Sequence, residues 1–96
     1  MIYITFEWDS WKARRNQLKH RVSFEEAESV FSDEAGVLIH DPGHSDEEDR
    51  FLLLGMSSKL RLLVISHTYR KSDDVIRLIS ARRAMPSEYE QYGGRK

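Results

Sequence analysis

The chain has 96 residues, of which 40% are hydrophobic and 32% charged, and its formal net charge is −1. We expect one small domain over residues 1–96, because this length supports a single core and no more. Since cysteine is absent, disulfide frameworks and thiolate metal sites are excluded. No apolar run reaches the roughly 18 residues that span a bilayer, and the N-terminus lacks the features of a signal peptide. We therefore expect a cytoplasmic protein without a membrane partner.

The charges are unevenly distributed along the chain. Residues 1–50 carry 12 acidic and 6 basic side chains, whereas residues 51–96 carry 4 acidic and 9 basic ones. A basic half in a near-neutral protein is typical of a local anion-binding face. The alternative is that folding interleaves the two halves and cancels the field.

The first segment predicts a strand and a helix. Residues 2–6 are rich in β-forming side chains, and Asp9 is a suitable N-cap for a helix that extends to about Lys19. The apolar positions near the helical period are Trp8, Trp11, Leu18 and Val22. The opposite side carries a polar stripe of Lys12, Asn16, Lys19 and His20.

A capping box predicts the start of a second helix. The Ser23 hydroxyl is placed to accept a hydrogen bond from the backbone N–H of Glu26, while the Glu26 side chain reaches back to the cap. We expect this helix to end near Ser32. Its buried face is formed by Phe24, Ala27, Val30 and Phe31.

Four strands and a last helix are predicted for the rest of the chain. The strands are residues 37–39, 50–56, 61–68 and 75–82, with turn chemistry at 41–43 and an acidic loop at 44–49. Pro86 opens a helix that continues through Tyr92, and residues 93–96 form a flexible tail. The predicted order β-α-α-β-β-β-β-α is an α+β fold, with the helices on one face of an antiparallel sheet.

Basic side chains concentrate on the last strands. Alternation places Ser80 and Arg82 on one face of the final strand and Arg83 on the other. Guanidinium groups beside the phenol of Tyr92 suit phosphate recognition, because arginine offers a planar fork of donors. The competing interpretation is that these arginines are solvated charges that protect a sheet edge.

Further cations and imidazoles extend this set. The candidates are Lys12, His20, Arg50, Arg61, His67, Arg70 and Arg83. Cations and imidazoles without a carboxylate dyad suit metal-independent RNA cleavage, in which the 2′-hydroxyl attacks the adjacent phosphate and no cofactor is needed. The alternative for each single histidine is a structural role.

The segment His40–Asp49 is a weaker candidate for a metal site. It combines two imidazoles with carboxylates that Mg²⁺, Mn²⁺ or Zn²⁺ could use, but no recognised ligand spacing occurs. A solvated acidic loop is the favoured interpretation, and a metal-dependent hydrolase remains the second alternative function.

An ordered set of short motifs resembles the BrnT family of type II toxins. The motifs are Phe6-Glu7-Trp8-Asp9, Lys19-His20, Val22-Ser23-Phe24-Glu25-Glu26-Ala27, His44-Ser45, Gly55-Met56-Ser57, His67-Thr68 and Ile79-Ser80-Ala81-Arg82-Arg83-Ala84. The resemblance implies a RelE-like fold and a ribonuclease (an mRNA interferase) that inhibits translation. It also implies neutralisation by a BrnA-like antitoxin similar to ribbon-helix-helix proteins, through which alone the complex would contact operator DNA.

Carried onto this chain, the resemblance implies a catalytic set of Arg82, Arg61 and Tyr92, to which residue chemistry adds His67. The RNA-binding set would be Lys12, His20, Arg50, Arg70 and Arg83. Family members often carry Gly-Arg in the central hairpin, where this chain has Lys59-Leu60-Arg61. The resemblance leaves open whether RNA is cut on the ribosome. The first alternative function is a non-catalytic module that binds RNA or an acidic protein without cutting it.

Overall fold

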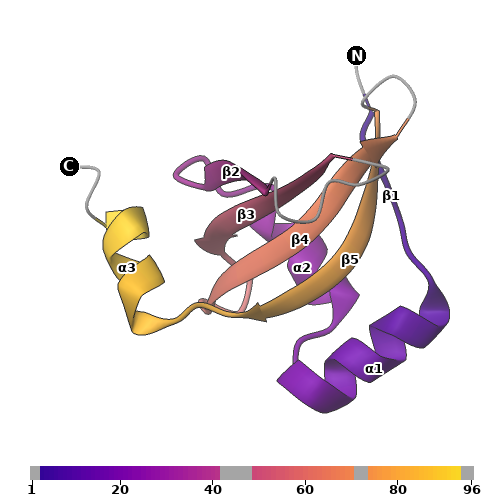
Figure 1. Ribbon diagram of the computed structural model, residues 1–96, viewed down its shortest axis with the longest axis horizontal. Coiled ribbons are helices and arrows are strands. Elements are labelled where there is room, and N and C mark those ends of the chain that lie inside the picture. The colour runs from indigo at the N-terminus through magenta and orange to yellow at the C-terminus, as the bar shows by residue number, and fades with distance from the viewer. Residues whose placement is uncertain (1–2, 42–48, 71–73, 94–96) are drawn as a thin grey trace.

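A computed structural model describes residues 3–41, 49–70 and 74–93, and it contains a mixed α+β fold (Figure 1). The elements are β1 (Thr5–Glu7), α1 (Ser10–His20), α2 (Phe24–Val30), β2 (Val37–Asp41), β3 (Arg50–Met56), β4 (Leu62–Arg70), β5 (Val75–Arg83) and α3 (Pro86–Gly93). This order is the one that the sequence predicts. None of the described helices is long and apolar enough to cross a membrane.

The five strands form one sheet in the order β1-β5-β4-β3-β2. Strands β2 to β5 are antiparallel neighbours, whereas β1 lies parallel to β5, with Thr5 beside Val75 and Glu7 beside Arg77. The prediction of a purely antiparallel sheet is therefore wrong at this edge. Two helices separate β1 from the other strands along the chain, so no hairpin turn dictates its direction.

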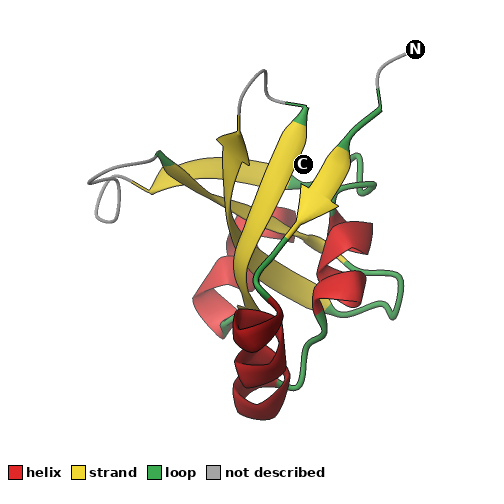
Figure 2. Cartoon of the chain, turned by 90° about the vertical axis from the view of Figure 1, so that its right-hand side faces the viewer, coloured by secondary structure: helices red, strands yellow, loops and turns green. Residues whose placement is uncertain are grey.

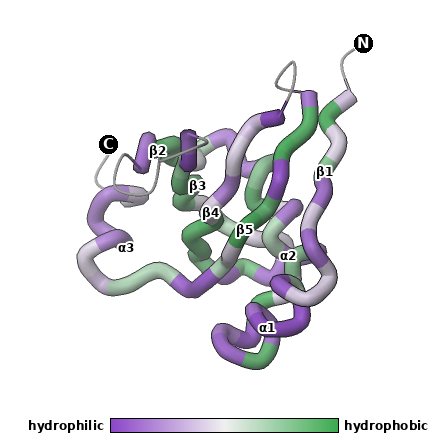
Figure 3. The backbone as a smooth tube through the Cα atoms, turned by 45° about the vertical axis from the view of Figure 1, so that its right-hand side comes forward, coloured by the Kyte–Doolittle hydropathy of each residue, from purple (hydrophilic) through white to green (hydrophobic). Residues whose placement is uncertain are grey.

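The helices cover both faces of the sheet, which corrects the prediction of helices on one face. On one face, Phe24 and Val30 of α2 pack with Leu63 and Ile65 of β4. On the other face, Tyr92 of α3 packs with a cluster formed by Leu54, Leu62 and Val64. Successive strand residues point to opposite faces, so the continuous apolar run in β4 requires cover on both sides. Figure 3 shows this hydrophobic run on the central strands.

The predicted caps are observed at both N-terminal helices. The Asp9 carboxylate accepts from the Trp11 backbone N–H at 2.7 Å, and the Ser23 hydroxyl accepts from the Glu26 N–H at 3.0 Å. The α1 helix ends where Arg21 adopts a left-handed conformation with φ of 59°. These local interactions explain why sequence located both helices well.

The α1 helix packs beside the β5 edge rather than over the sheet, as Figure 2 shows from the side of the molecule. Only Asn16 is buried on this helix. Trp11 and Leu18, which the helical period assigned to the apolar face, are 68% and 73% exposed. The prediction is therefore wrong for Trp11 and Leu18, because a helix at a sheet edge buries only a narrow stripe. It is confirmed for Val22, which is buried, and for Trp8, which packs against the core.

Candidate active site

A pocket of about 320 Å³ lies between α1 and β5. Its lining consists of Lys12, Arg15, Asn16, Lys19, His20, Ile79 and Ser80. The five helical residues follow the spacing i, i+3, i+4, i+7 and i+8, which places them on one side of α1. A single helix thus presents three permanent cations and an imidazole to the same cavity.

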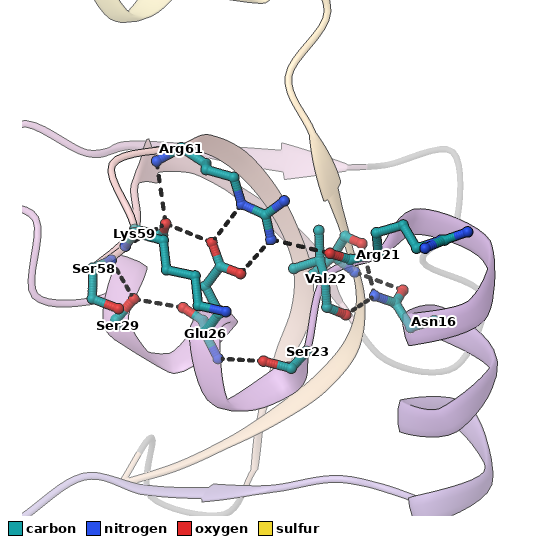
Figure 4. Close-up of polar contacts among 11 residues, drawn as sticks. Asn16, Arg21, Val22, Ser23, Glu26, Ser29, Ser58, Lys59 and Arg61 are labelled. Carbon is teal, nitrogen blue, oxygen red and sulfur yellow. Dashed lines mark hydrogen bonds and ion pairs between the residues drawn. The ribbon is translucent and has the colours of Figure 1, made fainter.

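Asn16 fastens α1 to the sheet at this pocket. Strand β1 pairs with β5 only as far as Arg77, so within the described part of the chain the later β5 edge has no strand neighbour. There the Asn16 amide donates to the Ala81 carbonyl at 2.8 Å and accepts from the Ala81 N–H at 3.0 Å. The amide also donates to the Val22 carbonyl at 2.9 Å (Figure 4). The Asn16 side chain therefore provides hydrogen-bond partners for the backbone N–H and carbonyl groups at the strand edge, and it holds the cations of α1 in a defined position relative to β5.

A bulge in the pairing of β4 with β5 precedes Ser80, which lines the pocket, and Arg82. Strand register slips between Ser66 and His67, so Ser80 pairs with Ser66 while Leu78 pairs with His67. The consequence is that Leu78 and Ala81 both face the α2 core. The extra residue reverses the alternation between Leu78 and Ser80, whereas Ser80 and Arg82 remain on one face, as the sequence predicts.

His20 is the residue of this pocket whose ordinary pKa lies nearest to neutral pH. Partial burial lowers the pKa of its imidazole below the ordinary 6.5, and the neighbouring charges of Lys19 and Arg82 lower it further. The Arg82 charge acts on His20 from β5, and Arg82 is not among the residues that line the pocket. A lowered pKa keeps His20 neutral at pH 7, so its ring has a free nitrogen that can accept a proton.

Arg82 also holds helix α3. Its two terminal nitrogens donate to the two Glu88 oxygens at 3.0 and 2.9 Å. The ion pair raises the pKa of Arg82 and lowers that of Glu88. Glu88 accepts in addition from the Met85 backbone N–H at 2.7 Å, at the start of the helix. With its side chain 33% exposed, Arg82 is positioned between the pocket and α3.

Residues 8–88 match the model of a family described as the ribonuclease toxin BrnT of type II toxin–antitoxin systems. The chain belongs to the BrnT family. A comparison with curated proteins gives no match.

The 1.1 Å crystal structure of the Brucella abortus ribonuclease toxin BrnT superimposes with a TM-score of 0.59. The two sequences are 22% identical, and the match covers 88% of this chain and 99% of the Brucella chain. At this identity the likeness shows a common fold. The BrnT α+β fold with five strands and three helices is thereby shared, and membership in a type II family implies a protein antitoxin.

Within this BrnT fold, Arg61 has a structural partner. Its Nε donates to the buried Glu26 carboxylate at 2.9 Å, a terminal nitrogen contacts the other carboxylate oxygen, and the Arg21 carbonyl accepts at 3.0 Å (Figure 4). The Ser57 hydroxyl completes the set by donating to Glu26 at 2.7 Å. This pairing lowers the pKa of Glu26, with Arg61 as the main cause. The Glu26 side chain thus binds Arg61 and Ser57, whereas the capping box predicts that it reaches back to the N-cap.

His67 is the clearest correction among the predicted site residues. It is fully buried, its ring packs against Phe31 and Tyr69, and its Nδ1 lies 3.1 Å from the Ile65 carbonyl oxygen. Burial lowers the pKa of the ring. A group that exchanges protons with a substrate must contact it, so this burial contradicts the expected catalytic role.

Other predicted residues are dispersed. The Tyr92 hydroxyl donates to Asp33 at 2.7 Å, which ties α3 to the segment after α2. Arg50 and Arg70 lie at the far ends of β3 and β4, and Arg70 is 3.9 Å from Glu7. Arg83 lines a second cavity. Only Lys12 and His20 of the expected RNA-binding set meet in the α1–β5 pocket, with Arg82 beside them.

Sequence reasoning missed Arg15, Lys19 and Ser80 as site residues. The helical spacing of Arg15 and Lys19 from Lys12 was an available signal. The metal interpretation rests mainly on residues 42–48, which lie outside the described part. Within the described residues no cluster of three metal-ligating side chains occurs, and His40 lies 3.6 Å from Asp49.

Proposed function

We propose that this BrnT-family chain is an endoribonuclease that cuts RNA in the α1–β5 pocket by metal-independent transesterification, and so inhibits translation. The observation that carries the proposal is that Lys12, Arg15 and Lys19 line one pocket with His20, whose pKa is lowered by burial and by the charges of Lys19 and Arg82. Cations of this kind bind a phosphodiester, and the histidine provides a base that is free at neutral pH.

The chemistry requires a base and charge stabilisation. The 2′-hydroxyl oxygen attacks the adjacent phosphorus, its proton passes to His20, and the bond to the 5′-oxygen breaks as that oxygen takes up a proton. A 2′,3′-cyclic phosphate and a 5′-hydroxyl are formed. Negative charge accumulates on the phosphoryl oxygens in the transition state, where Lys12 and Arg82 stabilise it. Arginine is suited to this role because it cannot lose its proton at neutral pH.

An exposed tryptophan supports the proposal that the substrate is RNA. Trp11 is 68% exposed, and the Arg14 guanidinium lies 5.5 Å from its ring centroid. Trp11 is one turn from Arg15 of the pocket, so the two side chains are neighbours on α1. Proteins bind single strands by stacking bases on aromatic rings beside a basic groove. Trp11 is therefore proposed to stack on a base next to the scissile phosphate.

The protein antitoxin is proposed to be a BrnA-like ribbon-helix-helix protein, which would bring the complex to operator DNA. Arg61 and Tyr92, expected to be catalytic, are instead assigned to maintaining the fold, because Arg61 pairs with the buried Glu26 carboxylate and Tyr92 ties α3 to Asp33. Arg82 also has a carboxylate partner, Glu88, but this pair is partly exposed and lies beside the pocket. Arg50, Arg70 and Arg83 are left outside the cleavage pocket.

The deciding experiment incubates purified protein with single-stranded RNA in excess EDTA. Cleavage that persists in EDTA, yields cyclic phosphate ends and is lost in Lys12→Ala supports the proposal. Arg77→Ala is the control, because Arg77 is a basic residue of β5 outside the pocket lining, with a terminal nitrogen 3.1 Å from a Glu7 carboxylate oxygen. Binding without cleavage would identify a non-catalytic module. Activity that needs an added divalent ion would identify a metal-dependent hydrolase.

A further inference from the structure

The turn between β3 and β4 presents an exposed leucine in a strained conformation. The Leu60 N–H donates to the Ser57 carbonyl at 2.9 Å, and the Ser57 N–H donates to the Arg61 carbonyl at 2.8 Å. This places Leu60 at φ of 61°, in the left-handed region where glycine is preferred. The side chain is nevertheless 83% exposed. Both strain and exposure are unfavourable in the isolated chain, which indicates a role for the side chain outside the fold.

Other apolar side chains gather near this turn. A cavity of about 280 Å³ is lined by Met56, Leu60, Arg61, Leu62, Arg83 and Tyr89. Tyr89 of α3 is 56% exposed, and Met85, between β5 and α3, is 59% exposed. The Ala84 N–H donates to the Leu62 carbonyl at 2.9 Å, which holds the β5–α3 connection against the start of β4, as Figure 1 shows. The β3–β4 turn, the end of β5 and α3 therefore line one cavity with apolar and basic side chains, and the exposed Met85 lies one helical turn from Tyr89.

Two exposed cations border this surface. Arg83 and Lys59 are exposed, and among the described residues Arg83 has no acidic partner. An apolar floor of leucine and methionine suits protein side chains better than nucleobases, which prefer aromatic faces. The exposed cations Arg83 and Lys59 at the edge of this surface favour a partner that carries carboxylates. The chemistry that fits is an amphipathic segment with apolar and acidic side chains.

We infer that the Leu60–Tyr89 surface, formed by Leu60, Met85, Tyr89 and Arg83, binds an acidic amphipathic segment of the antitoxin. This inference rests on the proposed function, because the type II family supplies the protein partner. The surface uses none of the residues that line the α1–β5 pocket. Antitoxin binding and RNA cleavage can therefore fail independently of each other.

The test measures binding by calorimetry with the purified product of the reading frame that adjoins the toxin gene. Leu60→Gly removes the side chain and suits the turn, so the fold is retained. Arg83→Glu reverses the rim charge. Each change is expected to weaken binding by at least about tenfold, as loss of an interface anchor does. Leu18→Ala, at a residue 73% exposed on α1, is the matched control and should bind as the wild type does.

Wild-type affinity in both Leu60→Gly and Arg83→Glu overturns the inference, as does a wild-type chain that does not bind this protein. A second titration uses a single-stranded RNA oligonucleotide. If the two substitutions weaken RNA binding and leave antitoxin binding intact, the surface belongs to RNA and the inference is wrong. Loss of RNA cleavage in Lys12→Ala with normal antitoxin binding separates the two functions.

Discussion

Replacing Arg61 with alanine tests whether this arginine maintains the fold or acts on RNA. The Glu26 side chain is 1% exposed and receives donors from Arg61 and from Ser57. Arg61→Ala leaves a buried carboxylate with its charge uncompensated, which typically costs about 3–5 kcal/mol. For a domain of this size each kcal/mol lowers the thermal midpoint by roughly 4–8 °C, so we expect a fall of at least about 12 °C.

The pH dependence of this loss has a defined sign. In the wild type the pKa of Glu26 is lowered, so the ion pair stabilises the fold above the ordinary glutamate pKa, and this stability is lost as pH falls through the folded pKa. Without Arg61, burial instead raises the pKa of Glu26. The carboxyl then takes up a proton during mild acidification and its penalty disappears. The deficit of Arg61→Ala is therefore largest at neutral pH and shrinks toward pH 4.

The assay is urea unfolding followed by tryptophan fluorescence at several pH values, with RNA cleavage measured in parallel. Adding Glu26→Gln to Arg61→Ala removes the buried charge and should recover part of the stability. Arg77→Ala, which breaks an exposed ion pair with Glu7, should change stability by about 1 kcal/mol or less. The structural assignment is refuted if Arg61→Ala loses less than about 1 kcal/mol at pH 7 while cleavage falls a hundredfold.

Four further outcomes are expected from the cleavage proposal. Arg82→Ala should lower the cleavage rate by about 10²–10³, and Arg82→Lys should lower it by less, whereas the control Arg77→Ala should leave the rate unchanged. A folded Arg82→Ala protein that cleaves at the wild-type rate contradicts the proposed site. Since His20 must be unprotonated to act as the base, the wild-type cleavage rate should fall as pH drops through the His20 pKa, which lies below 6.5. The rate of His20→Asn should not show this fall, and an unchanged pH–rate profile in this variant argues against His20 as the base. Trp11→Ala should weaken RNA binding by about tenfold with an unchanged thermal midpoint, because the ring is exposed; full affinity would exclude stacking. Induced expression should stop growth and co-expression of the antitoxin should restore it, so normal growth with soluble protein would count against a toxin.

The sequence by itself determined the order of elements and the composition of α1. Asp9 and Ser23 bind backbone groups within three residues, so the helix starts are local properties that a sequence reveals. The cationic side of α1 likewise follows from helical spacing, which is why Lys12 and His20 were correctly brought together. Local hydrogen bonds and periodicity do not depend on the rest of the fold.

Tertiary structure alone decided the side of the sheet that α3 covers, the parallel placement of β1, and the role of each polar residue. Arg61 is paired with Glu26 and Tyr92 with Asp33, and these partners come from distant parts of the chain. The position of His67 on β4 follows from strand alternation, but its burial depends on the aromatic rings of Phe31 and Phe51, which come from other parts of the chain. Arg61 is taken up by the fold because its partner carboxylate is buried, and His67 because the core encloses its ring. That is settled by long-range packing, which sequence spacing does not encode.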